Sequence, residues 1–593
     1  MSPRIYTSHL PHLPVDHCSV FTKLLASRGP DDVGGHPGSW TAFVDAGSGT
    51  ALTRAQVRKL ALSFAYGLRD HPSTRPLSKR GDTVLLFSPN SLAWPIVLYG
   101  CVAAGLRCTL ANSAYTSHEL GYQYKDSGAQ LVLTSEEGIS VVMQMFAELG
   151  LSKAEAENKI VVLRNDLRWA GGPPVAPRRE AAAFCSLEDL LSRGASEKEE
   201  LFDGKLSHET VYLCYSSGTT GNPKGVETTH NNITTLMDII TGYPQPPGDI
   251  PMLGMLPFYH IYGVSNVLHH PFYLGVPVVI QTRFDPVQFC ANIEKYRIGF
   301  AYIVPPVLVV LARHPAVDSY DISTLEYMLS GAAPLGADLV TLVQKRLLSK
   351  RKPGSTCLIT QGYGLTETSP STHMLDFTSC ERKVGSIGFL LPNLKLRLVV
   401  DDDGLVDAEE GQPGELWVHG ATVMKGYLNN SSATKNAITP DGWFKTGDIG
   451  RRDKDGYYYI ANLDSGSKKE LIKYKGFQVP PAELEAILLT HPDIADAAVI
   501  GVDDAQEATE LPRAYVVHAN PSKVKDAKAK AAFEQSVVKW METKVAKHKF
   551  LRGGVNVIEV VPKSAAGKIL RRHLRDLAKT EMAKGEIKVK ARL

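Results

Sequence analysis

Short apolar runs that close with turn residues recur through the first part of the chain. The clearest are Asp82–Asn90, Ala129–Glu137 and Asn158–Asp166, followed in the middle third by Pro277–Phe284, Phe300–Pro306 and Glu326–Pro334. Strands this apolar are buried on both faces, and helical patterns lie between them. The pattern therefore predicts α/β layers with parallel sheet.

The pattern changes after about residue 385. The stretches LPNLKLRLVVDDDG and GQPGELWVHG alternate apolar and polar positions between Gly and Pro, which is typical of antiparallel strands. Helical patterns return near residue 480, where Pro480 and Pro481 suit a helix start, and again over Phe533–Phe550. The polar stretch Asn462–Glu470 lies between the predicted antiparallel strands and the predicted C-terminal helices, and its composition is typical of a hinge.

We therefore expect an α/β chain in three parts. Residues 1–461 would form a large N-terminal domain of layered α/β sheets with a small β-barrel-like part. Residues 462–469 would be the hinge, and residues 470–593 a small mobile α+β domain. The most apolar stretch, Ser91–Leu106, is shorter than a membrane span and contains Pro95, so we interpret it as a buried helix and expect no transmembrane segment.

Composition supports a soluble globular protein of several units. The 593 residues are too many for one hydrophobic core, and 44% are hydrophobic and 21% charged. The formal net charge of +3 gives no reason to expect nucleic acid as a partner. The eight cysteines form no C-x-x-C pair, which argues against a disulfide framework or zinc site and favours reduced thiols.

The stretch YSSGTTGNPKGVETTH, Tyr215–His230, follows the apolar strand Val211–Tyr215. Small residues let a backbone approach a ligand closely, and clustered N–H and hydroxyl groups bind anionic oxygens. Lys224 adds one positive charge, so the loop suits phosphate. It is no Walker loop, because Gly225 follows Lys224 instead of preceding it. A flexible surface loop is the alternative for such a composition.

That stretch resembles the signature of the adenylate-forming enzymes: acyl-CoA synthetases, 4-coumarate–CoA ligases, luciferases and the adenylation domains of peptide synthetases. Further matches follow in order along the chain: LPFYHIYG (Leu256–Gly263), SGAAPLG (Ser330–Gly336), QGYGLTETSP (Gln361–Pro370), GWFKTGDIG (Gly442–Gly450), KELIKYKGFQVPPAELE (Lys469–Glu485) and PKSAAGKILRR (Pro562–Arg572). The resemblance covers essentially the whole chain and is strongest to the 4-coumarate–CoA ligase and luciferase branch.

The resemblance implies a two-step ligase that uses ATP and Mg²⁺, with coenzyme A as co-substrate. A small carboxylic acid attacks the α-phosphate of ATP to give acyl-AMP and pyrophosphate, and the CoA thiol then displaces AMP. Such chemistry depends mainly on positioning and charge neutralisation. By this resemblance the β- and γ-phosphates would be bound by Ser216, Ser217, Gly218, Thr219, Thr220, Gly221 and Lys224. Glu367 would bind the metal, Thr366 would contact the α-phosphate, and Asp448 would bind the ribose. Adenine would be lined by Gly331, Ala332, Ala333, Gln361, Gly362 and Tyr363.

The resemblance also assigns catalytic and CoA-facing residues. Lys568 would reach the α-phosphate during adenylation, and His260 would guard the passage to CoA. The thioester-forming face would carry Lys473 and Gln478, CoA contacts would come from Arg283, Lys475 and Gly476, and Lys469 would be the hinge lysine. One departure is that the Arg which relatives place before the hinge, in contact with ribose, is absent from Tyr459–Glu470, where Leu463 or Ser467 stands instead.

By the same resemblance the acyl pocket lies around the SGAAPLG and QGYGLTETSP motifs. Its residues would be Tyr262, Asn266, Ser330, Gly331, Ala332, Gly362, Gly364, Pro370, Ser371 and Met374. Gly362 and Gly364 would leave room for a flat or long acyl group, whereas Asn266 and Ser371 are polar. Aromatic, medium-chain and polyketide-derived acids all stay open.

Three alternatives to a free-standing CoA ligase stay open at this point. They are an enzyme that loads a separate carrier protein, a luciferase-like oxygenase and a non-catalytic nucleotide-binding relative. A fused loading module is not expected, because 25 residues follow Lys568. The terminus Ala591-Arg592-Leu593, with Lys590 upstream, resembles a peroxisomal address and predicts binding to the peroxisomal import receptor, with the cytoplasm as the alternative location.

Overall fold

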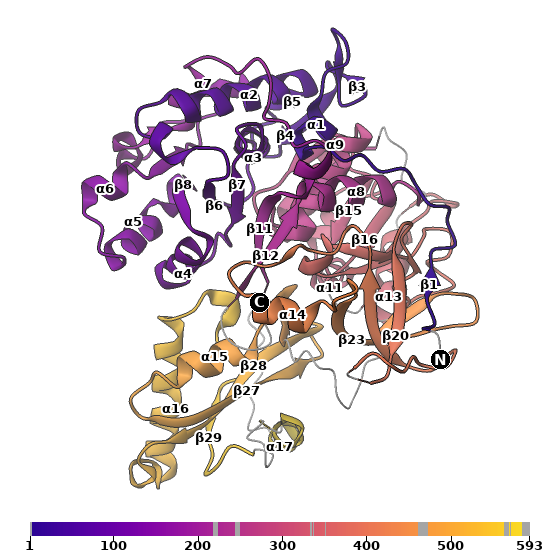
Figure 1. The fold of residues 1–593 in the computed structure, drawn as a ribbon. Coiled ribbons are helices and arrows are strands. Elements are labelled where there is room, and N and C mark those ends of the chain that lie inside the picture. Colours follow the sequence, from indigo (N-terminus) through magenta and orange to yellow (C-terminus); the bar gives the residue numbers. More distant parts are fainter. Residues whose placement is uncertain are drawn as a thin grey trace.

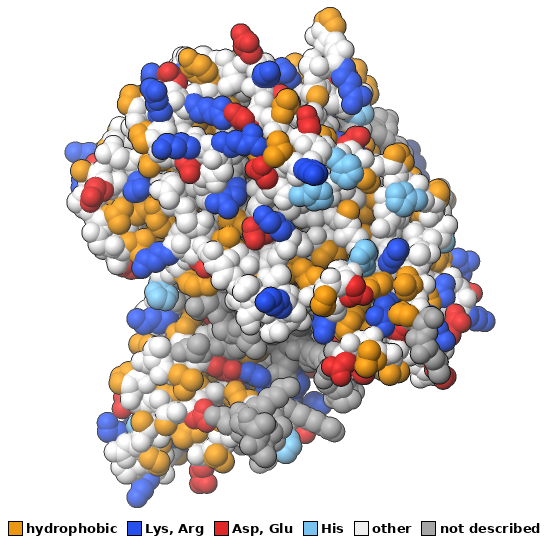
Figure 2. Space-filling model, in the orientation of Figure 1, with side chains coloured by type: hydrophobic (Ala, Val, Ile, Leu, Met, Phe, Trp, Pro, Cys, Tyr) orange, Lys and Arg blue, Asp and Glu red, His pale blue; other side chains and the backbone are white. Residues whose placement is uncertain are grey.

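The computed structural model (Figure 1) describes residues 3–216, 223–243, 250–332, 335, 337–349, 351–401, 403–460, 472–562, 569 and 571–583. Within these residues, the part before residue 461 contains two large sheets, a smaller antiparallel sheet and a short two-stranded sheet of β2 (Asp32–Val33) and β3 (His36–Pro37), together with the helices that cover them. A separate three-stranded sheet with its own helices forms the C-terminal lobe. Figure 2 shows a notch on one side between this lobe and the larger body. The predicted fold class is confirmed, and the predicted domain limits stay predictions.

The first large sheet has its strands in the order β10-β9-β8-β6-β7-β11-β12-β22. Their bounds are Cys185–Ser186 (β10), Ile160–Leu163 (β9), Ala129–Ser135 (β8), Thr83–Phe87 (β6), Arg107–Leu110 (β7), Thr210–Ser216 (β11), Lys224–Thr229 (β12) and Gly426–Tyr427 (β22). The six strands from β10 to β11 are parallel, and β12 and β22 are antiparallel additions. Helix α3, Ala93–Ala103, is buried along its whole length, which confirms the interpretation of the most apolar stretch.

The second large sheet has the order β19-β18-β17-β16-β15-β13-β14-β4-β5. Its bounds are Phe389–Leu390 (β19), Ser371–Met374 (β18), Leu358–Gly364 (β17), Tyr327–Ser330 (β16), Phe300–Ile303 (β15), Met252–Gly254 (β13), Val278–Ile280 (β14), Thr41–Asp45 (β4) and Ala51–Thr53 (β5). The strands from β17 to β4 are parallel, so their carboxyl ends meet along one edge. The segments that carry most of the predicted site residues leave the sheet at that edge.

A third sheet is antiparallel throughout and takes the place of the expected barrel-like part. Its order is β1-β20-β21-β23-β24, with bounds Tyr6–Thr7, Lys395–Val399, Gly414–His419, Phe444–Arg452 and Tyr458–Ile460. Strand β23 carries Asp448, and β24 ends directly before the predicted hinge. The hinge and Lys469 lie outside the described residues.

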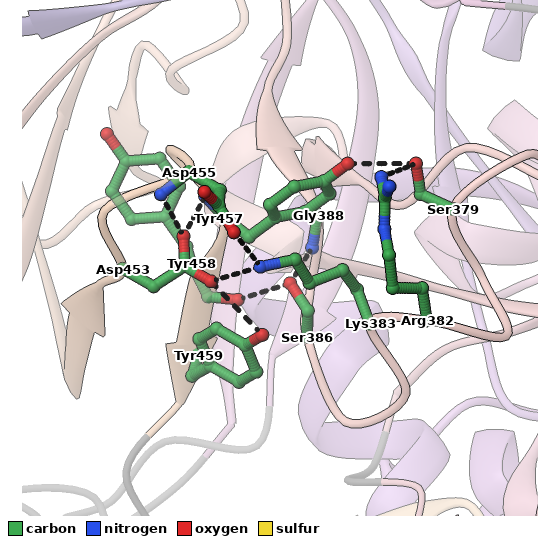
Figure 3. A network of polar contacts seen from close by, with 10 residues as sticks. All are labelled: Ser379, Arg382, Lys383, Ser386, Gly388, Asp453, Asp455, Tyr457, Tyr458 and Tyr459. Atoms are coloured by element: carbon green, nitrogen blue, oxygen red, sulfur yellow. Dashed lines mark hydrogen bonds and ion pairs between the residues drawn. The ribbon is translucent and has the colours of Figure 1, made fainter.

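A polar network fixes the chain just before that hinge (Figure 3). Lys383 forms ion pairs with Asp453 at 2.8 Å and with Asp455 at 2.6 Å, and its Nζ lies 4.6 Å from the centre of the Tyr457 ring. The Ser386 hydroxyl donates to the carbonyl of Tyr458 at 2.8 Å. These contacts hold β24 to the loop around residues 379–388, so the position of Ile460, the last residue described before the predicted hinge, is fixed.

The C-terminal lobe is built on strands β27 (Ile494–Asp504), β28 (Thr509–His518) and β29 (Val555–Val557). One face packs with the hairpin of β25 (Ile472–Tyr474) and β26 (Phe477–Val479) and with helices α15 (Pro481–Leu488) and α16 (Ala527–Glu542). The other face packs with α17 (Arg571–Ala583) and with Ile569. Pro480 and Pro481 open α15 as predicted, whereas α16 begins six residues before the predicted Phe533.

All eight cysteines are free, as expected. Among the described residues, no helix combines the length and apolar character that crossing a bilayer demands.

Candidate active site

The described ends of the Gly/Ser/Thr stretch are two paired strands, which the sequence did not predict. Strands β11 and β12 pair antiparallel, with Ser216 opposite Lys224. Residues Lys224–Thr229, interpreted above as loop, form a strand because β11 and β22 both offer it backbone partners. Ser217, Gly218, Thr219, Thr220 and Gly221 lie outside the described residues, between two ends that the hairpin holds in place.

Glu367 gathers the polar groups at this end of the site. Its Oε1 accepts hydrogen bonds from the Ser216 hydroxyl at 3.1 Å and the Tyr427 hydroxyl at 2.8 Å. The Lys224 Nζ lies 5.0 Å from the centre of the Tyr427 ring, close enough for a cation–π contact. Burial, with the nearby Glu367, raises the pKa of Tyr427, so its hydroxyl stays a donor. The sequence did not identify Tyr427 as a site residue, because no sequence pattern links it to Glu367, sixty residues earlier in the chain.

Glu367 has one carboxylate oxygen to which no described residue donates a hydrogen bond, and such an oxygen suits Mg²⁺. Both hydrogen bonds to Glu367 go to Oε1, and none from a described residue goes to Oε2. In the part of the chain that the structure describes, no group of three His, Cys, Asp or Glu residues could form a complete metal cage. Mg²⁺ is usually held by one or two carboxylates together with substrate phosphates, and Glu367 fits that pattern.

Tyr363 and Asp448 meet although they lie 85 residues apart. The Tyr363 hydroxyl donates to Asp448 Oδ2 at 2.7 Å, and burial, with the Asp448 charge, raises the pKa of Tyr363. Gln361 is buried beside Ser330 in the paired strands β17 and β16, and Ala332 follows with φ +67°. Three other residues predicted to bind the nucleotide lie in the two motifs that carry Ser330 and Gln361: Gly331 in the first, and Gly362 and Thr366 in the second. Ala333 lies outside the described residues.

His260 is held between the two large sheets. Asn90, after β6, donates to the carbonyl of Leu256 and accepts from the amide of Phe258, both at 2.9 Å. The Tyr262 amide donates to His260 Nδ1 at 3.2 Å, so the neutral ring carries its proton on Nε2. Desolvation by the surrounding protein lowers the pKa of His260 to about 4, although the residue is exposed.

The predicted acyl-pocket residues converge beside His260. The Tyr262 hydroxyl donates to the carbonyl of Leu329 at 3.3 Å, and its ring lies 3.1 Å from the position that a Cβ on Gly331 would take. The Asn266 Nδ2 donates to the Ser371 hydroxyl at 3.3 Å in buried surroundings. These contacts join the carboxyl edge of the second sheet to the helical segment after His260.

The rest of the predicted pocket comes from the β17–β18 hairpin. Met374 pairs with Gly362 in its register, and Pro370 directly precedes β18. A Cβ on Gly364 would lie 2.0 Å from the carbonyl of Pro370, so the glycine there serves close backbone approach and not room for substrate. A Cβ on Gly362 would meet ordinary contacts at 3.5 Å.

The β25–β26 hairpin brings C-terminal residues to the same edge. Lys473 and Gln478 are paired across it, and a Cβ on Gly476, whose φ is +86°, would lie 3.2 Å from the Val304 side chain. Val304 follows β15, where the Ile303 carbonyl accepts the Gly331 amide at 3.2 Å. The hairpin tip therefore lies next to Gly331, one of the residues predicted to line the acyl pocket. The side chain of Gln478 lies outside what the structure describes.

The two basic residues predicted to contact CoA differ in their surroundings. Lys475 pairs with Glu507 at 2.7 Å. Arg283 is exposed just after β14, at the carboxyl edge of the second sheet. Lys568 lies outside the described residues, and its neighbour Ile569 packs on the face of the C-terminal sheet opposite the hairpin.

Comparisons with known proteins agree with this architecture. The family model for AMP-binding enzymes matches residues 31–428, and that for the AMP-binding enzyme C-terminal domain matches residues 483–568. The chain belongs to the AMP-binding enzyme family. It is 34% identical over 550 residues to 4-coumarate-CoA ligase 1 of Narcissus pseudonarcissus, covering 92% of each chain. The predictions of an AMP-forming acyl-CoA ligase and of its family are confirmed.

Two solved structures of o-succinylbenzoate CoA synthetase from Bacillus subtilis share the fold. A double mutant bound with a product analogue gives a TM-score of 0.71 at 24% identity, covering 91% of this chain and 95% of the other. The complex of that synthetase with its acyl-adenylate intermediate gives 0.58 at 25% identity, with 91% and 96% covered. The TM-score of this synthetase against the present chain therefore differs between its two complexes.

Proposed function

We propose that this enzyme activates a small carboxylic acid with ATP and Mg²⁺ and transfers the acyl group to CoA through an acyl-adenylate. The observation that carries the proposal is that a phosphate end and an acyl end meet at the β17–β18 segment, where Glu367 contacts the first large sheet and Ser371 contacts Asn266. Ser216, Glu367 and Tyr427 mark the first, and His260 and Asn266 the second. An acid and a triphosphate bound there would meet between the two ends.

At the phosphate end, the chain supplies charge and hydrogen-bond donors. Lys224 and the hairpin loop would bind the β- and γ-phosphates, and Glu367 Oε2 would hold Mg²⁺, which neutralises phosphate charge when bound. A carboxylate oxygen of the acid attacks the α-phosphorus, and the bond to pyrophosphate breaks. Lys568, by family resemblance, would offset the negative charge that develops on the α-phosphate.

At the acyl end, His260 stays neutral near pH 7 because its pKa is lowered to about 4. Because the imidazole is neutral, it would not attract the acid's carboxylate away from the α-phosphate as an imidazolium would. Its Nε2–H can still donate one hydrogen bond. Tyr262 and Gly331 close the pocket on one side, and Asn266 and Ser371 give its wall polar groups. The CoA sulfur then attacks the acyl carbon, and the bond to AMP breaks.

The present arrangement of the two domains suits the second half-reaction. The hairpin with Lys473 and Gly476 lies beside the acyl pocket, whereas the residue next to Lys568 lies on the opposite face of the C-terminal sheet. The better superposition on the product-analogue complex than on the acyl-adenylate complex supports this assignment. Adenylation would then require the C-terminal domain to rotate about its hinge.

A panel of acids tests the function. Purified enzyme with ATP, Mg²⁺ and each acid should release pyrophosphate, and CoA should convert the bound adenylate to a thioester with release of AMP. Ser371→Phe should narrow the range of acids accepted, because added volume clashes in a packed pocket. Pyrophosphate release without any CoA thioester, together with acylation of a carrier protein, would contradict the choice of CoA as acceptor.

We also propose that the enzyme acts in the peroxisome. Ala591-Arg592-Leu593 would be bound by the import receptor. A fluorescent fusion that leaves this terminus free should give a punctate pattern, and removal of the three residues should make it diffuse. A diffuse signal from the intact terminus would place the enzyme in the cytoplasm.

A further inference from the structure

A buried ionic cluster joins the two domains. Lys549, in the C-terminal lobe, lies with its Nζ 2.8 Å from Glu119 Oε1 and 2.8 Å from Glu483 Oε1. All three side chains are between 5% and 7% exposed. Glu483 lies in the first turn of α15, within the same lobe as Lys549. Glu119 lies in α4, Ser117–Ser127, of the N-terminal domain, and Figure 1 shows α4 directly beside that lobe.

The two carboxylate oxygens of Glu119 have separate roles. Oε2 accepts the amide and hydroxyl of Thr116, both at 2.9 Å, which completes a capping box at the start of α4. Oε1 points across the domain boundary to Lys549. The helix therefore holds the carboxylate rigidly in place for a partner that belongs to the other domain.

The Lys549–Glu119 pair, which crosses the boundary between the two domains, favours the charged forms of both groups. Burial alone would raise the pKa of Glu119, but the ammonium of Lys549 and the bonds from Thr116 outweigh it and lower that pKa. The two carboxylates likewise raise the pKa of Lys549 against the effect of burial. Burial raises the pKa of Glu483, whose Oε2 finds no partner among the described residues. The contact across the boundary is therefore an ammonium–carboxylate pair.

Lys549 is also connected to the hairpin that approaches the acyl pocket. The ring of the preceding residue, His548, stacks on Phe477 of β26 at 4.4 Å between centroids. Gly476 lies next to Phe477, and a Cβ placed on it would lie 3.2 Å from the Val304 side chain. A fixed distance from Glu119 to Lys549 thus fixes where the hairpin tip meets the N-terminal domain.

Buried ion pairs are poor stabilisers, because desolvation offsets most of their attraction, but they select one geometry over others. The Lys549–Glu119 pair exists only while this face of the C-terminal domain is docked. We propose that Lys549, through Glu119, is a positioning residue that holds the C-terminal domain in the pose for thioester formation. This proposal rests on the assignment of the present pose to that half-reaction.

Glu119→Gln tests the proposal with little other disturbance. Gln also completes capping boxes, so α4 keeps its N-terminus, and Lys549 keeps Glu483. Thioester formation from supplied acyl-AMP and CoA should fall about tenfold, because the charge pair that favours docking is lost. Acyl-AMP formation from acid and ATP should be unchanged. Lys549→Arg should retain more of the thioester rate than Lys549→Met.

Glu155→Gln is the matched control. Glu155 completes the same kind of capping box, with Ser152, at the start of helix α6, Lys153–Glu157, on the exposed surface. The control should leave both half-reactions unchanged. If it slows thioester formation as much as Glu119→Gln does, the effect comes from capping and the positioning role is overturned.

The pose itself can be measured without any chemistry. Arg313, at the end of α11 (Pro305–Arg313), donates to the carbonyl of Gln506 in the C-terminal domain at 2.7 Å, and both residues are exposed. Cysteines at these two positions should be cross-linked by a short bismaleimide, and Glu119→Gln should slow that cross-linking severalfold. An unchanged cross-linking rate would overturn the proposal.

The two readouts keep this proposal separate from the proposed function. Slower cross-linking with an unaltered thioester rate would mean that the pair holds a pose without serving that step, which also overturns the positioning role. If the unmodified enzyme forms no thioester with any acid, the proposed function fails, and the cross-linking comparison still reports on the pair.

Discussion

The two faces of the C-terminal sheet differ in what they bring to the active site. One face carries the β25–β26 hairpin, and it meets the N-terminal domain through Gly476 and Lys549. The opposite face carries α17 and Ile569, the neighbour of Lys568. Because the sheet separates the hairpin from Ile569, we expect Lys473 and Lys568 to reach one substrate only in different poses of the domain. Under the proposed function, the domain would present its two faces in turn, one for each half-reaction.

Removing Lys568 should give the largest effect and the sharpest test of this difference. Lys568→Ala should slow acyl-AMP formation by roughly 10²–10³, because a charge that stabilises the transition state is lost. Thioester formation from supplied acyl-AMP and CoA should stay near normal. The two rates are measured separately, by pyrophosphate release and by thioester yield. An equal loss in the rates of acyl-AMP formation and thioester formation would show that the two faces do not serve separate half-reactions.

Lys473→Ala should show the opposite bias with a smaller effect. Lys473 is exposed on the hairpin, so its contribution to thioester formation should be about tenfold, close to 1.4 kcal/mol. Adenylation should be largely retained. A variant that loses adenylation instead would place the hairpin face in the first half-reaction and reverse the comparison.

A bulkier residue at the hairpin tip should weaken docking directly. Gly476→Val places a side chain against Val304 and should slow thioester formation about fivefold, as overpacking costs on the order of 1 kcal/mol or more. Gly150→Val is the control, because Gly150 has a similar φ of +83° with nothing within 4 Å of its Cβ position. Similar losses from both variants would mean that backbone strain, not contact with Val304, is responsible.

The sequence predicted those parts of the fold that depend on local pattern. The run of buried residues in β6 and the apolar helix α3 follow from hydrophobicity alone, and Pro481 marks the start of α15. It failed at β12, because Lys224–Thr229 is polar and becomes a strand only through partners on both sides. Strand pairing of this kind depends on tertiary context more than on propensity.

The site was predicted through motifs, and its internal contacts were not. Spacing cannot show that Tyr427 binds Glu367, or that Lys549 meets Glu119 across 430 residues. Gly364 shows a related limit, because its motif position suggested room for substrate while the structure shows a close backbone approach to Pro370. Such contacts follow from how elements pack, so they become visible only in three dimensions.

The hydrogen bond between Tyr363 and Asp448 has a consequence for turnover. A ribose hydroxyl that binds Asp448 Oδ2 would compete with the Tyr363 hydroxyl, so nucleotide binding at that oxygen exchanges one hydrogen bond for another and gains little net free energy. We expect AMP to leave readily after each cycle for this reason. Tyr363→Phe should strengthen AMP binding about threefold in calorimetry and slow AMP release. In that variant Asp448 has no hydrogen bond from residue 363 to lose when the ribose binds. Weaker binding by that variant would mean that the ring's hydroxyl holds the nucleotide and does not compete with it.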